Sequence, residues 1–275
     1  MTHTPELATP HTLHTLLTAC QQQAEIEIPS TWGQGRATYG GLVAAMLISH
    51  LIGQLDPAQV LRSATVSFVA PALAGTATLS AEILRQGKSA TQAEARLWQD
   101  GQVVAVLLAS FALPRESSIQ VAPIHAAPEF NAATPLDVSQ MPYIAGMMPE
   151  FFQHLDIRWA KGKPPFSGAA RPDFAGWMRY QDQSLPEFGL AHFFGLIDAW
   201  PPAVLPMFKS PAPASSLCWT LEFIRQPVGY TAADYWRYAV QCDAAADGYA
   251  HTEAHIWDAQ GRLMAISRQT VSVFA

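Results

Sequence analysis

Asp198 is the residue of this sequence whose setting most favours chemistry. A helix is predicted over residues 185–200, and Asp198 lies near its end, among Phe193, Phe194, Leu196, Ile197, Ala199 and Trp200. A carboxylate in such surroundings is costly to bury unless it is hydrogen-bonded. The C-terminal end of a helix also disfavours a negative charge. We therefore expect Asp198 to act as a general base or to orient a water molecule.

Gln269 is a second candidate, on a strand predicted over residues 263–274. The two-residue period of a strand puts its side chain on the same face as Val271 and Val273. An amide both donates and accepts hydrogen bonds, so Gln269 could hold the water that Asp198 activates. The alternative is an amide satisfied by backbone groups.

Gly40 and Gly41 stand at the start of an apolar helix predicted over residues 41–55. The first N–H groups of a helix have no partner within the helix and are natural donors to an oxyanion. The alternative is that glycine here only permits close packing between helix and sheet.

The elements that must position these residues occur twice in the same order. The first half has a short helix within residues 1–22, a strand at 24–29, the helix 41–55, and four strands at 61–69, 77–85, 91–99 and 103–113. The second half has strands at 151–161 and 174–182, the helix 185–200, and four strands at 216–225, 235–243, 249–257 and 263–274. Asp100-Gly101 predicts a tight hairpin turn between two of the strands.

Landmark residues recur at a nearly constant offset, as a duplication predicts. Phe68 and Phe223 lie 155 positions apart (223 − 68), and Gly101 and Gly261 lie 160 apart (261 − 101). We therefore predict two units, residues 1–113 and 151–275, joined by a linker over residues 114–150. Ala109 stands where the second unit has Gln269, which indicates a single active site.

Each long helix is apolar almost all round, so it must be wrapped rather than laid on a surface. The predicted class is α+β, with two curved antiparallel sheets that each wrap one long helix. Two such units can join edge to edge into one continuous sheet, which removes two exposed edges.

Composition narrows the function classes. The chain has 275 residues, 49% of them hydrophobic and 14% charged, with a net charge of −6. This balance argues against a nucleic-acid partner. Cys20, Cys218 and Cys242 have no disulfide or metal-like spacing. Met1–Pro10 lacks the pattern of a signal peptide, and the apolar run at 42–52 is too short to span a membrane. We expect a cytoplasmic protein with free thiols.

Four segments together resemble the double-hotdog acyl-CoA thioesterases of the type II (TesB-like) branch. They are residues 35–41 (GRATYGG), 85–89 (RQGKS), 195–198 (GLID) and 262–269 (RLMAISRQ). The resemblance covers most of residues 24–113 and 151–275. It implies a tandem hotdog fold, hydrolysis of an acyl-CoA thioester, no metal or redox cofactor, and further association into a homo-oligomer.

The resemblance also implies roles for particular residues. A helix aspartate, a strand hydroxyl and a strand glutamine position the water in this family, and they fall on Asp198, Ser216 and Gln269. Many relatives have Thr at the hydroxyl position, and Ser215 is an alternative match. In hotdog assemblies the helix start of one unit faces the catalytic residue of the other. This arrangement implies that the backbone N–H of Gly40 or Gly41 polarises the thioester carbonyl.

Arg85 and Lys88 are the candidates for contact with the coenzyme phosphates, as in the family. His251 and His255 are four positions apart on a predicted strand, and the sequence shows no further ligand set beside them. We therefore expect no metal site.

Two other functions remain open at this stage. A non-catalytic module could keep the acyl slot and only bind acyl-CoA. A hotdog hydratase would pair a helix or loop histidine with a carboxylate, as that branch does. His50 has no such partner before Asp56, and His192 and Asp198 lie on different helix faces, so the hydratase reaction is the less favoured alternative.

Overall fold

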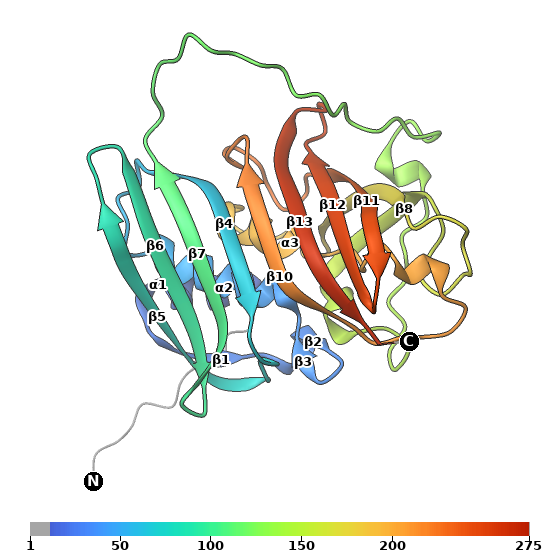
Figure 1. Ribbon diagram of the computed structural model, residues 1–275, viewed down its shortest axis with the longest axis horizontal. Coiled ribbons are helices and arrows are strands. Elements are labelled where there is room, and N and C mark those ends of the chain that lie inside the picture. The colour runs from blue at the N-terminus through green and yellow to red at the C-terminus, as the bar shows by residue number, and fades with distance from the viewer. Residues whose placement is uncertain (1–11, 275) are drawn as a thin grey trace.

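The computed structural model describes residues 12–274 and is built around one antiparallel sheet of eleven strands (Figure 1). Three helices lie behind the sheet in this view, so one face of the sheet forms the core with them. The prediction of two sheets needs correction, because the two sets of strands are hydrogen-bonded to each other in the middle. This pairing satisfies the backbone groups of two strands that would otherwise be exposed edges.

The first half of the chain supplies one side of the sheet. After helix α1 (Leu13–Gln22) and strand β1 (Glu25–Ile28), a glycine-rich loop contains a small separate hairpin that precedes helix α2 (Gly40–Ile52). The part of the predicted helix before residue 12 lies outside the described residues. The hairpin strands are β2 (Gly33–Gln34) and β3 (Ala37–Thr38), and the strands after α2 are β4 (Val60–Phe68), β5 (Gly75–Gln86), β6 (Ala90–Gln99) and β7 (Gln102–Ala112).

The second half repeats this order on the other side. It begins with a 3₁₀ turn (Glu150–His154) and strands β8 (Leu155–Lys161) and β9 (Phe174–Tyr180), followed by helix α3 (Leu190–Ile197). The four strands after α3 are β10 (Ala214–Phe223), β11 (Trp236–Ala246), β12 (Tyr249–Trp257) and β13 (Leu263–Val273). Outward from the centre, the order is β4-β7-β6-β5-β1 on one side and β10-β13-β12-β11-β9-β8 on the other. The four strands after each helix therefore occupy matching places.

The central pair, β4 and β10, joins the halves. Leu221 pairs with Ala64 and Trp219 with Val66, and all four side chains are buried. The helices meet on the inner side of this junction, where small residues let them approach closely. A methyl group on Gly195 would lie 3.5 Å from the Ala45 Cβ and 3.7 Å from the Gly41 carbonyl oxygen, both on α2, and Tyr39 Oη donates a 2.6 Å hydrogen bond to the Gly195 carbonyl. These contacts fix the start of α2 against the end of α3.

A long segment joins β7 to the second half and contains no strand between residues 113 and 149. It leaves β7 at the top of Figure 1 and crosses to the side of the second half. Contacts tie parts of it down, since Trp257 Nε1 donates to the His125 carbonyl at 3.3 Å and the Met141 N–H donates to the Ile157 carbonyl at 2.8 Å. None of the described helices is long and apolar enough to cross a membrane.

Candidate active site

Asp198 is the first residue after α3 and lies where the two halves meet. Its backbone torsions (φ −82°, ψ 5°) leave the helix, and Pro201 and Pro202 follow soon after. The helix before it is buried from Ala191 to Ile197, whereas Asp198 keeps partial access to solvent. The end of α3 disfavours its charge, and the start of α2, which faces it, favours that charge.

Asp198, Gln269 and Ser216 form a continuous chain of hydrogen bonds. Gln269 Nε2 donates to Asp198 Oδ1 at 2.6 Å, and Ser216 Oγ donates to Gln269 Oε1 at 2.8 Å. The amide therefore uses its donor on the carboxylate and its acceptor on the hydroxyl. Because the acceptor is directed at Ser216, the Gln269 amide is held in the orientation that aims an N–H at Asp198.

An irregularity in β10 aims Ser216 at this site. The pairing of β10 with β13 shifts between Ser216 and Cys218. In a regular strand, residues three apart face opposite sides of the sheet, and such a bulge changes this direction. Ser216 and Trp219 consequently both face inward, Ser216 toward Gln269 and Trp219 toward Ser267. Ser215, the alternative match, has an exposed side chain.

The electrostatics of Asp198 are unusual for a carboxyl. Burial raises the pKa of Asp198 to about 7, although hydrogen bonds from Gln269 and from the Gly41 backbone N–H lower it. A carboxyl with a pKa near 7 can accept a proton and release it again at neutral pH.

Gly40 and Gly41 lie against this carboxylate at the start of α2. A methyl group on Gly40 would come 3.0 Å from Asp198 Oδ2 and 3.2 Å from the Phe68 ring. The Gly41 N–H already interacts with Asp198. The helix start of the first half thus meets the carboxylate of the second.

A small cavity opens beside Asp198 and Gln269. Its volume is about 10 Å³, close to the smallest space that admits one water molecule. Tyr238, Thr252 and Ser267 add polar groups to its wall. Apolar groups complete it, among them Trp200, Pro201 and Val240.

Arg85 and Lys88 are not brought to this site. Both are exposed, at the end of β5 and in the turn that follows it. Four strands separate β5 from the strand of Gln269, so the distance along the sheet is about 24 Å at the usual strand spacing.

Sequence reasoning missed the two tyrosines that surround the carboxylate. The hydroxyls of Tyr39 and Tyr238 are buried, and proximity to Asp198 adds to the effect of burial in raising the pKa of each. Tyr39 immediately precedes the glycine pair, so its position was a usable signal. Nothing near Tyr238 in the sequence indicates that β11 borders the site.

Two family models match the chain. Residues 28–112 match the acyl-CoA thioesterase N-terminal domain, and residues 131–273 match the acyl-CoA thioesterase C-terminal domain. Among curated proteins, none matches this chain.

Solved structures share the fold. A conserved protein of unknown function with a hot dog fold, from Alicyclobacillus acidocaldarius, is 22% identical with a TM-score of 0.78, over 91% of this chain and 92% of that one. An acyl-CoA thioesterase II from Mycobacterium marinum is 20% identical with a TM-score of 0.67, over 91% and 93% of the chains. A tesB protein from Mycobacterium avium is 13% identical with a TM-score of 0.72, over 94% and 98%. At these identities the likeness concerns the fold.

Proposed function

Because the chain belongs to the acyl-CoA thioesterase family, we propose that it hydrolyses an acyl-CoA thioester to a carboxylic acid and CoA. We also propose that its architecture is a double hotdog. In this arrangement the units 1–113 and 151–275 are joined through β4 and β10, and residues 114–150 connect them.

The observation that carries this proposal is the hydrogen-bond chain from Ser216 through Gln269 to Asp198. It ends on a carboxyl whose pKa is near 7, beside a cavity the size of one water molecule. A structural carboxylate would be expected to pair with a cation, and none of the ion pairs among the described residues includes Asp198.

In the proposed reaction, Asp198 takes a proton from the water while the water oxygen bonds to the thioester carbonyl carbon. Gln269 and Ser216 hold the carboxylate and the water in line for this attack. The tetrahedral intermediate then collapses, the carbon–sulfur bond breaks, and the CoA sulfur receives the proton from Asp198. Atoms and charges balance without a cofactor.

The start of α2 is our candidate for the oxyanion site. N–H groups at a helix N-terminus stabilise a developing negative charge, and the lack of a side chain on Gly40 lets Asp198 Oδ2 lie close to this helix start. Gly41 has a different part in this account, because its N–H is directed at Asp198. We assign Gly41 to holding the base and the N–H of Gly40 to the carbonyl oxygen.

Turnover of an acyl-CoA panel tests this function. The panel runs from acetyl to stearoyl-CoA and includes phenylacetyl- and benzoyl-CoA. CoA and the free acid should appear in equal amounts for at least one ester. Chromatography is the better assay, because Cys218 and Cys242 are free and partly exposed and would react with a thiol reagent. If the esters bind but none is hydrolysed, the chain is a binding module and the proposal fails.

A further inference from the structure

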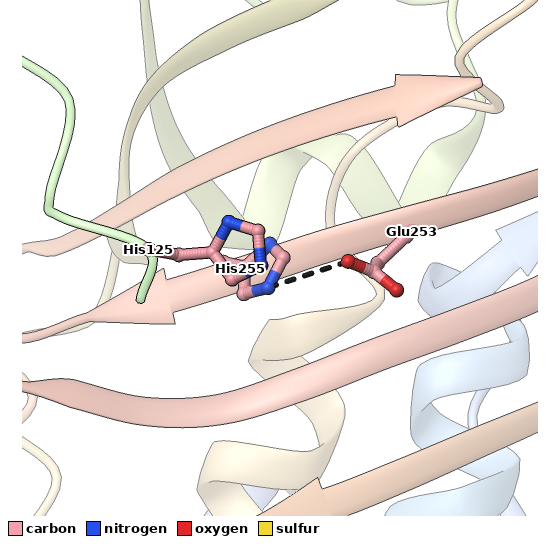
Figure 2. A group of neighbouring side chains, drawn as sticks. All are labelled: His125, Glu253 and His255. Atoms are coloured by element: carbon pink, nitrogen blue, oxygen red, sulfur yellow. Dashed lines mark ion pairs between the residues drawn. The ribbon is translucent and has the colours of Figure 1, made fainter. Parts of the chain in front are cut away.

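Three residues with metal-ligating side chains meet on the second half of the sheet (Figure 2). They are His125, from the segment that joins the halves, and Glu253 and His255, from β12. Each offers one ligand atom, and these atoms lie within 4.8 Å of one another. The His125 and His255 rings face each other with centroids 4.0 Å apart. Two segments 130 residues apart in sequence (255 − 125) therefore bring a His₂Glu set together.

This cluster lies on the opposite face of β12 from Asp198. Thr252 and Ala254 line the small cavity beside Asp198. Glu253 and His255, which alternate with them, line a separate cavity of about 400 Å³ under the joining segment. Because side chains alternate along a strand, the two sites share a strand but not a surface.

One ring nitrogen of His255 is buried without a hydrogen-bond partner among the described residues. The residue is 6% exposed, and its Nε2 forms no hydrogen bond with any residue in the described range 12–274. A buried polar nitrogen without a partner is uncommon and costly. Burial and the neighbouring His125 and Arg268 lower the pKa of His255, against the opposing effect of Glu253.

Glu253 is oriented toward that nitrogen. Arg268 Nη2 holds Glu253 Oε2 at 2.6 Å, while Oε1 lies 3.4 Å from His255 Nε2. Two ligands of a tetrahedral zinc ion, each about 2.1 Å from the metal, lie about 3.4 Å apart. The distance between Oε1 and Nε2 therefore already suits a bound ion. The Arg268 contact resembles the outer-shell partners that orient metal ligands.

We infer that His125, Glu253 and His255 bind one divalent transition-metal ion, with Zn²⁺ the best fit to this ligand set. Three protein ligands leave a fourth position open toward the cavity. By binding His125 on one side and Glu253 and His255 on the other, the ion would fix the joining segment to β12. Lys161 and Asp173 also line the cavity, so their opposite charges face the site together with Arg268.

Zinc binding by the full chain tests this inference. After treatment with a chelator and its removal, titration calorimetry with Zn²⁺ alone should show one site per chain. His125→Ala is the first variant, because His125 is exposed on the joining segment and its removal leaves the sheet intact. His255→Ala and Glu253→Gln are the second and third. Each of the three substitutions should weaken Zn²⁺ binding by about 10-fold or more, because losing even an outer-shell partner of a metal ligand lowers metal affinity by about that much.

His251→Ala is the matched control. His251 lies on the same strand, is exposed and contacts Thr270, so this variant should bind Zn²⁺ as tightly as the wild type. Zn²⁺ should raise the Tm of the wild type and of His251→Ala more than that of the three ligand variants, since ligands that bind only the folded state stabilise it. Absence of a stoichiometric site overturns the inference, and so does equal affinity in wild type and His125→Ala. Neither result depends on whether the chain hydrolyses thioesters.

Discussion

The backbone of Gly40 and the carboxylate of Asp198 belong to different halves of the chain, yet they lie too close together for a side chain to fit between them. A methyl group on Gly40 would lie 3.0 Å from Asp198 Oδ2. The two positions are 158 residues apart in sequence (198 − 40). The proposed site therefore exists only when both halves are folded and joined, and this arrangement suits a chain in which one copy supplies the carboxylate.

Gly40→Ala should lower activity while leaving the fold intact. The added methyl group would press on Oδ2 and on Phe68. A displacement of that kind costs roughly 10- to 100-fold in kcat. The free energy of unfolding should change little, because Gly40 is the first residue of α2 and the advantage of alanine over glycine, about 1 kcal/mol, applies to a helix interior. Steady-state kinetics and thermal unfolding measure the two effects separately.

Gly189→Ala is the control for this substitution. Gly189 precedes α3 as Gly40 begins α2, and nothing lies within 4 Å of the position its methyl group would take. This variant should keep wild-type kcat. Equal activity in the wild type and Gly40→Ala would show that the Gly40 contact has no part in catalysis.

The pH dependence of hydrolysis should follow the ionisation of Asp198. Burial raises the pKa of this carboxyl to about 7, and only the ionised form accepts a proton from water. We expect kcat/KM to rise about tenfold per pH unit below 7 and to level off above it. In Gln269→Ala the rise should move to higher pH, because the lost hydrogen bond lowers the pKa in the wild type. A flat profile between pH 5 and 8 would contradict this account.

The same raised pKa should make the folded chain less stable as pH rises. Between its ordinary value of 3.8 and about 7, Asp198 binds more protons in the folded chain than in the unfolded one. The free energy of unfolding therefore falls through this window and levels off above it. The full effect of a shift this large is on the order of 4 kcal/mol. Asp198→Asn removes the titrating group without changing its size.

Urea unfolding at pH 4.5 and pH 7.5 measures this effect. On going from pH 4.5 to pH 7.5, the wild type should lose the stabilisation that the raised pKa of Asp198 provides, whereas Asp198→Asn should not. The variant should therefore be more stable relative to the wild type at pH 7.5 than at pH 4.5. Other titrating groups cancel in the comparison, since both proteins carry them. If this difference is the same at the two pH values, the pKa of Asp198 is not raised in the folded chain.

Ser216→Ala should lower kcat by roughly 10-fold. It leaves Gln269 Oε1 without the hydroxyl that donates to it at 2.8 Å, and an unpaired polar atom of this kind costs about 1–3 kcal/mol. Ser216→Thr should restore activity, because it returns the hydroxyl. Ser215→Ala, at the exposed neighbouring position, should have no effect. If instead Ser215→Ala is the damaging change, the hydroxyl has been assigned to the wrong residue.

Most elements of the fold could be predicted because local signals mark them. Strand β12 has both predicted ends, Tyr249 and Trp257. The predicted turn at Asp100-Gly101 is present, with positive φ angles of 51° and 75°, as a two-residue hairpin turn requires.

Prediction failed where a local pattern had two possible outcomes. The strand expected from Phe151 begins only at Leu155, because the chain after Pro149 first forms a 3₁₀ turn. The helix expected over 185–200 is limited to Leu190–Ile197. Gly189 explains its late start, since glycine does not suit a helix interior and stands here just before the first helical residue.

The site was predictable where a single charged or polar residue stands among apolar neighbours in the sequence. Asp198 is a charge among apolar residues, and Gln269 is polar on an inward face. The direction of Ser216 depends on a bulge in β10, which the sequence around it does not reveal. The group of His125 with Glu253 and His255 depends on the path of a long joining segment. Sequence spacing carries no information about such a path, and the sequence showed no further ligand set beside His251 and His255.

The most direct test of the central claim compares CoA release by the wild type and by Asp198→Asn, on the ester that the wild type hydrolyses fastest. Asparagine keeps the size and one acceptor oxygen of the side chain but cannot take a proton from water. We predict that kcat falls by about 10² to 10⁴, the usual contribution of a general base, while acyl-CoA binding is retained. Wild-type kcat in Asp198→Asn would contradict the claim that Asp198 activates the water.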